Sequence, residues 1–113
     1  MGHSHVSCYV SHPRTELAAV CDLRSEAVDE FREKWPDLSD TKTYTDFREL
    51  LSNEQPDIIS VVTGDHVHAD LTVAAAGSSA QAIFCEKPIA TTIEDADRMI
   101  AACDHNGVLL SID

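Results

Sequence analysis

Short apolar runs alternate along the chain with segments whose apolar residues recur at helical spacing. Apolar runs of this length, bounded by turn residues, are typical of buried strands in a parallel sheet. The alternation therefore predicts a doubly wound α/β fold, in which right-handed crossovers place helices on both faces of a parallel sheet. Predicted strands cover residues 15–22, 42–45, 56–63, 80–86 and 108–112. Predicted helices cover residues 25–35, 46–52, 68–77 and 93–107.

Several helix ends carry recognisable signals. Pro36 stops the helix before it, and Thr92 with Asp95 forms a capping box at the start of residues 93–107. Gly77 is suited to a left-handed cap at the end of residues 68–77. These signals support separate, short helices between the strands.

Composition and charge narrow the class of protein. The chain has 113 residues, 43% of them hydrophobic, which fits a folded domain with one core and predicts a single unit over residues 1–113. Its 20 acidic and 8 basic residues give a formal charge of −12, which repels nucleic acid and anionic lipid. No apolar run approaches the length of a membrane helix, and the four dispersed cysteines suit a reducing compartment. We therefore expect a cytoplasmic protein that binds neither nucleic acid nor membrane.

Polar residues follow the predicted strands at the ends where open parallel sheets bind their ligands. Asp22 ends the first predicted strand, and an acidic residue there can accept hydrogen bonds from a ribose 2′-hydroxyl. Asp22 can equally serve the dipole of the helix that follows it. Arg24 could attract a 2′-phosphate instead, or be a solvated surface charge.

Lys87 lies in the triplet Glu86-Lys87-Pro88, directly after an apolar run. A lysine held at a strand end beside a carboxylate can be fixed in direction, and a proline stiffens the backbone next to it. The alternative is an exposed Glu-Lys pair in a loop. The triplet is suggestive of a functional group but does not establish one.

Two groups of residues raise the possibility of a metal site. One is His66 with His68, and the other is His3, His5 and Cys8 near the start of the chain. Neither group has a fixed set of three or four ligands in sequence, and histidines at helix starts are more often surface or hydrogen-bonding residues. We predict no metal site.

Taken in order, the segments "ELAAVCD", "DIISVVTGDHVHAD", "FCEKPIATTIEDADRMI" and "GVLLSI" resemble the nucleotide-binding domain of the Gfo/Idh/MocA oxidoreductases. The resemblance covers essentially the whole chain. The family pattern has an acidic residue after its second strand, T-P-x-x-x-H after its fourth and E-K-P after its fifth. Asp22, residues 63–68 and residues 86–88 match these elements at the expected spacing.

The resemblance implies NAD or NADP as cofactor and hydride transfer to or from a sugar, cyclitol or similar polyol. It implies that Asp22 holds the adenosine ribose, that Thr63 and its neighbours Gly64 and His68 line the path to the nicotinamide, and that Glu86 contacts the nicotinamide ribose. It also implies that Lys87 acts on the reacting hydroxyl and that the Lys87-Pro88 peptide is cis.

The chain departs from the family pattern in three places. Gly64 stands where the family usually has proline, which is expected to loosen the turn. Gly2 matches the third glycine of the family's G-x-G-x-x-G, with residues 3–13 as the first helix, so the first strand is expected to be missing and its two neighbours to have unpaired edges. The family's second α/β domain, which carries most substrate contacts, is also absent from the sequence.

The chain is therefore expected to be an incomplete dinucleotide-binding domain over residues 1–113, of marginal stability and inactive alone. The parent would be an NAD(P)-dependent oxidoreductase acting on a small polyol or sugar. The alternative is a noncatalytic fragment that binds a nucleotide or a partner. The sequence does not indicate an oligomeric state.

Overall fold

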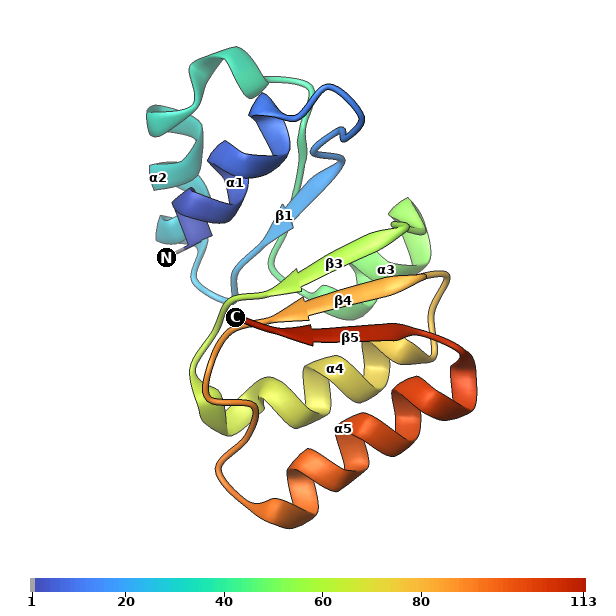
Figure 1. Ribbon diagram of the computed structural model, residues 1–113. Coiled ribbons are helices and arrows are strands. Elements are labelled where there is room, and N and C mark those ends of the chain that lie inside the picture. Colours follow the sequence, from blue (N-terminus) through green and yellow to red (C-terminus); the bar gives the residue numbers. More distant parts are fainter. Residues whose placement is uncertain (1) are drawn as a thin grey trace. The chain divides into compact units, whose positions relative to one another are not determined.

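The computed structural model describes residues 2–113, and Met1 lies outside the described part (Figure 1). Helices and parallel strands alternate along the chain, which confirms the predicted α/β class. The chain divides into two compact units, Met1–Glu54 and Gln55–Asp113. Each unit contains its own parallel sheet. The predicted sheet is thus built as two separate sheets.

The first unit has a two-stranded sheet, in which β1 pairs with β2 in parallel. Ala19 is opposite Lys42 and Cys21 is opposite Tyr44. The buried apolar side chains of this unit, among the described residues, are Val6 of α1 and Phe31 of α2. Its elements are α1 (Gly2–Ser11), β1 (Ala19–Cys21), α2 (Ser25–Lys34), the 3₁₀ turn η1 (Pro36–Leu38), β2 (Lys42–Tyr44) and α3 (Phe47–Glu54).

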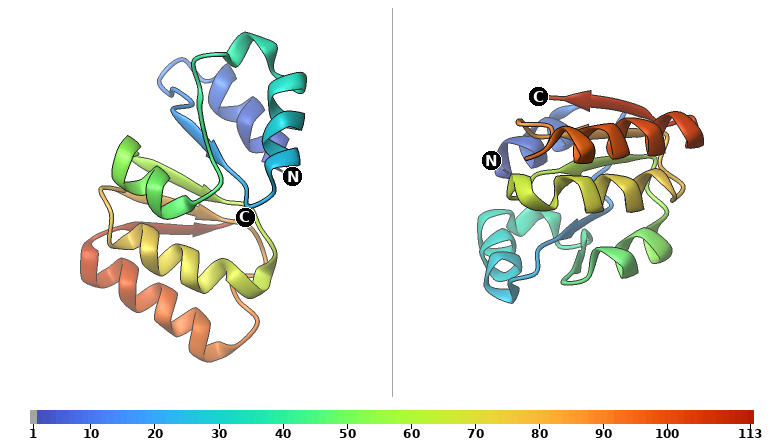
Figure 2. Two further views of the ribbon diagram at one scale, coloured as in Figure 1. Left: turned by 180° about the vertical axis from the view of Figure 1, so that it is seen from behind. Right: turned by 90° about the horizontal axis from the view of Figure 1, so that it is seen from below.

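The second unit has a three-stranded parallel sheet in the order β3-β4-β5. Helices α4 and α5 pack against each other and cover one face of this sheet, as Figures 1 and 2 both show. Its elements are β3 (Ile58–Val61), the 3₁₀ turn η2 (Asp65–Val67), α4 (His68–Ala76), β4 (Ala82–Cys85), α5 (Ile93–Asn106) and β5 (Leu109–Ile112).

The core of the second unit follows from the alternation of side chains along its strands. Val61, Ile83 and Cys85 point to the helix-covered face, where Met99 and Cys103 of α5 meet them. Small residues of α4 complete this core and let the helix approach the sheet closely: Ala69, Ala75 and Ala76.

The cap prediction for α5 is confirmed, because the Thr92 side chain accepts a hydrogen bond from the Asp95 amide at 3.1 Å. The prediction for Gly77 was wrong. Gly77 has φ −81° and ψ 0°, and its amide donates to the Val73 carbonyl as within a helix. The next amide, of Ser78, donates to the Ala75 carbonyl, so α4 ends in a tightened turn that needs no left-handed residue. The left-handed glycine is Gly107, with φ 66°, which ends α5.

The strand pairing of the described residues leaves unpaired edges in both sheets. β1 pairs only with β2, and β3 pairs only with β4, so each strand has one open edge. Within residues 2–113, no helix is long and apolar enough to cross a membrane.

Candidate functional site

The turn after β3 and the turn after β4 are joined by the side chain of His68. His68 is the first residue of α4 and is only 1% exposed. Its Nδ1 lies 2.9 Å from the carbonyl oxygen of Pro88, and its Nε2 lies 3.1 Å from the carbonyl oxygen of Thr63. Both ring nitrogens therefore contact backbone of the two turns in which the sequence placed the site.

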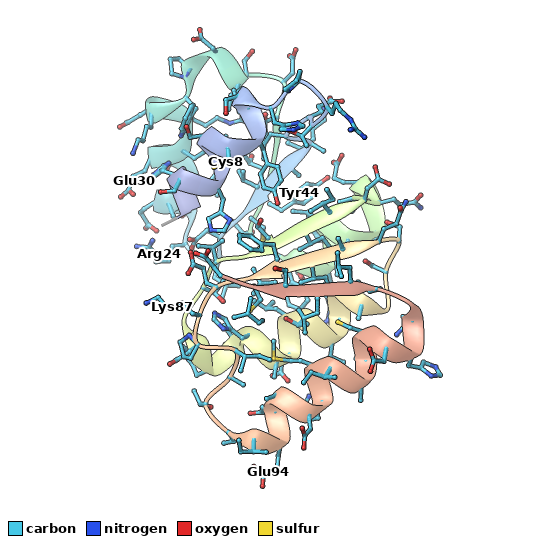
Figure 3. All side chains as sticks on the ribbon, in the orientation of Figure 1. Cys8, Arg24, Glu30, Tyr44, Lys87 and Glu94 are labelled. Carbon is cyan, nitrogen blue, oxygen red and sulfur yellow. The ribbon has the colours of Figure 1, made fainter. Side chains whose placement is uncertain are left out.

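The turn after β4 contains the triplet that the sequence singled out. The amide of Glu86 donates to the carbonyl of Val61 at 3.0 Å, which extends the pairing of β3 and β4 by one residue and leaves Glu86 4% exposed. The Lys87-Pro88 peptide is cis, as expected. Lys87 itself is exposed, and Figure 3 shows its side chain pointing outward from the turn.

The ammonium of Lys87 makes no hydrogen bond or ion pair with any residue from 2 to 113. In contrast, Arg98 is paired with Asp70 at 3.1 Å and with Asp95 at 2.7 Å. A lysine at a strand end with no protein partner can contact a ligand without first breaking an ion pair. The arrangement fits the role that the resemblance implies for Lys87.

The turn after β3 exposes Thr63 and Gly64. The Thr63 hydroxyl lies 3.4 Å from the Gly64 carbonyl, and Gly64 has φ −64° and ψ 141°. A Cβ at Gly64 would lie 2.7 Å from Cε1 of His66, so the imidazole of His66 fills the space that a side chain at residue 64 would occupy. Nothing in the residue pattern indicates this contact.

In the first unit, Asp22 directly follows β1 and is exposed in part. Its amide donates to the carbonyl of Tyr44 at 3.2 Å, which holds the end of β1 against β2. One carboxylate oxygen, Oδ1, accepts from the Arg24 amide at 2.9 Å and lies 3.5 Å from Arg24 Nε. Asp22 and Arg24 are therefore brought together, as two charges at one strand end.

Cys21 precedes Asp22 and is not an activated thiol. Burial, followed by the nearby charges of Asp22 and Asp46, raises the pKa of Cys21 to about 11. A thiol with such a pKa is almost entirely protonated at neutral pH, so it is a poor nucleophile.

Gly2 is the first residue of α1, and open space surrounds the position that a Cβ would take there. The first turn of α1 contains no acidic side chain that would neutralise the positive end of the helix dipole. Gly2 thus has the surroundings expected of a glycine that lets a ligand approach a helix start.

Two of the histidines considered as metal ligands have hydrogen-bond partners within the protein. His68 is bound at both nitrogens, as described above. The Nδ1 of His3 accepts a hydrogen bond from the indole of Trp35 at 3.1 Å. The sequence had no signal for this bond, which joins residues 32 positions apart.

A family model described as "Oxidoreductase family, NAD-binding Rossmann fold" matches residues 1–113. The chain is 32% identical over 92 residues to inositol 2-dehydrogenase of Salmonella typhimurium, a match that covers 81% of this chain and 26% of that protein. It is 33% identical over 109 residues to D-apiose dehydrogenase of Paraburkholderia graminis, a match that covers 96% of this chain and 28% of that protein.

Solved structures give the same result. The WlbA dehydrogenase of Bordetella pertussis, crystallised with NADH and UDP-GlcNAcA, matches with a TM-score of 0.88 and 26% identity, over 99% of this chain and 33% of that one. A probable dehydrogenase of Thermotoga maritima matches with a TM-score of 0.85 and 30% identity, over 98% of this chain and 32% of that one.

The fold and the family model identify an NAD-binding Rossmann domain of the kind found in oxidoreductases. The chain belongs to the Gfo/Idh/MocA family. It spans about a quarter to a third of the length of the relatives that it matches.

Proposed function

We propose that residues 1–113 form the incomplete dinucleotide-binding domain of an NAD(P)-dependent oxidoreductase that acts on a sugar, cyclitol or similar polyol. The observation that supports the proposal most is the pair of turns after β3 and β4, which are joined by His68 and of which the second carries Lys87. The matched relatives that carry sugar and inositol dehydrogenase names support the substrate class.

The residues at the strand ends fit a dinucleotide. The carboxylate of Asp22 is held by Arg24 through Oδ1, so Oδ2 remains for the hydroxyls of a ribose. Gly2 at the start of α1 would adjoin the pyrophosphate. In the second unit, Thr63, Gly64 and Glu86 would line the nicotinamide side. His68 and Pro88, which we also propose to lie at the cofactor site, would act mainly by holding the turns.

Lys87 is the proposed catalytic residue. When bound, the nicotinamide nucleotide supplies or accepts the hydride. The ammonium of Lys87 would hold the reacting hydroxyl of the substrate by a hydrogen bond and assist movement of its proton. These residues lack the groups that fix a substrate carbon in place, so the chain by itself is expected to bind nucleotide without appreciable turnover.

The choice between NAD and NADP depends on Asp22 and Arg24. The carboxylate favours the 2′-hydroxyl of NAD, whereas the guanidinium could hold the 2′-phosphate of NADP. Because the Arg24 guanidinium already lies 3.5 Å from Asp22, we propose that NAD is preferred.

A cytoplasmic location belongs to the same proposal, since the described cysteines are all free thiols.

A titration with each nucleotide tests the proposal. Trp35 is the only tryptophan in the chain, and its indole is bonded to His3 near the start of α1. NADH should therefore quench its fluorescence saturably, and NADPH should do so more weakly. Asp22→Ala should weaken NADH binding about tenfold or more, by loss of a charged hydrogen-bond acceptor. Asp104→Ala, which removes an exposed carboxylate from α5, is the matched control.

Failure to bind either nucleotide, with the fold confirmed by circular dichroism, would contradict the proposal. The noncatalytic alternative predicts the same binding by this chain, but no dehydrogenase activity in any longer protein that contains it. Dehydrogenase activity of such a protein on a polyol, and its loss in Lys87→Met, would decide between them.

A further inference from the structure

The bend that joins α5 to β5 (Figure 1) contains the only asparagine-glycine pair of the chain. Asn106 is the last residue of α5, and Gly107 follows it in the left-handed conformation, with φ 66° and ψ 31°. Both residues are exposed. The other asparagine of the chain, Asn53, is followed by Glu54. Because glycine has no side chain, its nitrogen can approach the preceding side chain more easily than the nitrogen of any other residue.

We propose that Asn106 is a site of covalent modification, at which the side-chain amide is converted without a catalyst into a carboxylate. The backbone nitrogen of Gly107 attacks Cγ of Asn106, and the bond from Cγ to Nδ2 breaks. The proton of the attacking nitrogen leaves with Nδ2 as ammonia, which gives a cyclic imide. Water then opens the ring, at Cγ to give aspartate or at the backbone carbonyl carbon to give isoaspartate. The inference does not rest on the function proposed above.

The folded chain holds both reacting groups. Nδ2 of Asn106 donates to the carbonyl oxygen of Ala102 at 2.8 Å, and the amide of Gly107 donates to the carbonyl oxygen of Asp104 at 3.3 Å. The attack requires that both hydrogen bonds open, so that the Asn106 side chain can turn toward the Gly107 nitrogen. The last turn of α5 therefore slows the reaction, and the opening of this turn sets its rate.

Local opening is sufficient, because the pair is not covered by other parts of the described chain. Apart from its chain neighbours, no described atom lies within 4 Å of the place where a Cβ at Gly107 would be, so the imide ring meets open space. Val108 is the next fixed point, since it is 8% exposed and its amide donates to the Cys103 carbonyl at 2.9 Å. Helix ends open at a small fraction of the free energy of global unfolding. The modification is therefore expected in the folded chain, at a lower rate than in the unfolded chain.

The products fit the end of α5 less well than asparagine does. A carboxylate can only accept hydrogen bonds, so the bond to the Ala102 carbonyl is lost. The new charge lies at the negative end of the helix dipole, two residues after the carboxylate of Asp104. Isoaspartate also adds a carbon to the backbone between α5 and the buried Val108, which disturbs the left-handed bend at Gly107. The modification thus loosens the connection between α5 and β5.

Peptide mapping by mass spectrometry tests the site, on the 113-residue chain kept at neutral pH for increasing times. Carboxylate should accumulate at Asn106, whereas Asn53 should remain an amide. In urea that unfolds the chain, conversion of Asn106 should be faster by about tenfold or more, because α5 no longer holds the reacting groups. Equal rates in the folded and the unfolded chain would overturn the proposal. So would conversion of Asn53 as fast as that of Asn106, or a folded chain that keeps its amide after the unfolded chain has been converted.

A pair of charge variants tests whether opening of the last turn sets the rate. Asp104→Lys places a cation at the negative end of α5, which stabilises the last turn, so conversion of Asn106 should become about two- to fivefold slower. Asp97→Lys makes the same change of charge at an exposed residue in the middle of α5 and should leave the rate nearly unchanged. Equal rates in the two variants would refute the role of the last turn.

The Asn106→Asp variant tests the effect of the product. Loss of the bond to Ala102 and the added charge should accelerate hydrogen exchange at the Gly107 amide about two- to fivefold, while the amides of β3 and β4 keep their rates. An unchanged rate at Gly107 would show that the carboxylate fits the bend as well as the amide does, and would refute the loosening of the connection.

Discussion

At the turn after β3, Gly64 has the backbone conformation of a residue that need not be glycine. Its φ of −64° and ψ of 141° are values that proline also adopts. The expectation that glycine loosens this turn therefore concerns the unfolded chain more than the folded one. What excludes a side chain in the folded state is the imidazole of His66, 2.7 Å from where a Cβ would lie. The absence of a side chain at Gly64 thus leaves the space that the His66 ring occupies.

Replacing Gly64 should therefore have an effect that depends on His66. In a His66→Ala background, Gly64→Pro should stabilise the chain by about 0.4–1 kcal/mol, because proline restricts the unfolded chain without straining the turn. With His66 present, the gain should be smaller, since the exposed ring must move aside. Urea unfolding of the single and double variants measures the difference. Equal effects of Gly64→Pro in both backgrounds would show that the two residues are not coupled.

Among the elements, α5 has the most completely capped ends. Thr92 caps its start with a side-chain bond to the Asp95 amide, and Gly107 ends it in the left-handed conformation. Arg98 joins α5 to α4 through Asp70. Because exposed ion pairs contribute little, the caps matter more than this pair to the position of α5. The turn after β4, which carries Lys87, leads directly into this capped start.

Removal of the cap should have a measurable cost. Thr92→Ala should lower the free energy of unfolding by about 1 kcal/mol, because the Asp95 amide loses its acceptor. Thr92→Ser should keep most of the stability, since its hydroxyl can accept the same bond. Thr91→Ala is the control, as Thr91 is exposed and precedes the cap. Urea unfolding followed by circular dichroism gives the values, and equal losses in Thr91→Ala and Thr92→Ala would contradict the role of the cap.

The buried apolar side chains are distributed unequally between the two units of the molecule. The main hydrophobic cluster, from Val61 to Val108, lies in the unit of residues 55–113. Among the described residues of the first unit, the buried apolar side chains are Val6 and Phe31. The first unit also has the shorter sheet, with three residues in each strand. Burial of less apolar surface implies a lower free energy of local unfolding in this unit.

Amide hydrogen exchange should report this difference. Amides of β3, β4 and β5 should exchange more slowly than those of β1 and β2, because the first unit opens more often. Phe31→Ala should accelerate exchange in the first unit by more than in the second. Ile83→Ala is the matched core variant for the second unit. Identical opening free energies in the two units would show instead that the chain unfolds as one cooperative whole.

The order of elements was predictable because each depends on local signals. The period of apolar residues located the strands, and Thr92 with Asp95 located the start of α5. The error at Gly77 arose because a glycine near a helix end permits a left-handed cap without requiring one. The candidate site residues were predicted largely from the spacing of Asp22, residues 63–68 and residues 86–88.

The amino-acid sequence alone was sufficient for the α/β class, the family and the strand ends at which the candidate site residues lie, since all of these depend on residue type and spacing along the chain. Only the folded structure could show that both nitrogens of His68 meet carbonyl groups from two turns, that His66 takes the space beside Gly64, and that Arg24 already pairs with Asp22. These contacts depend on directions of side chains in space, on which periodicity and composition carry no information.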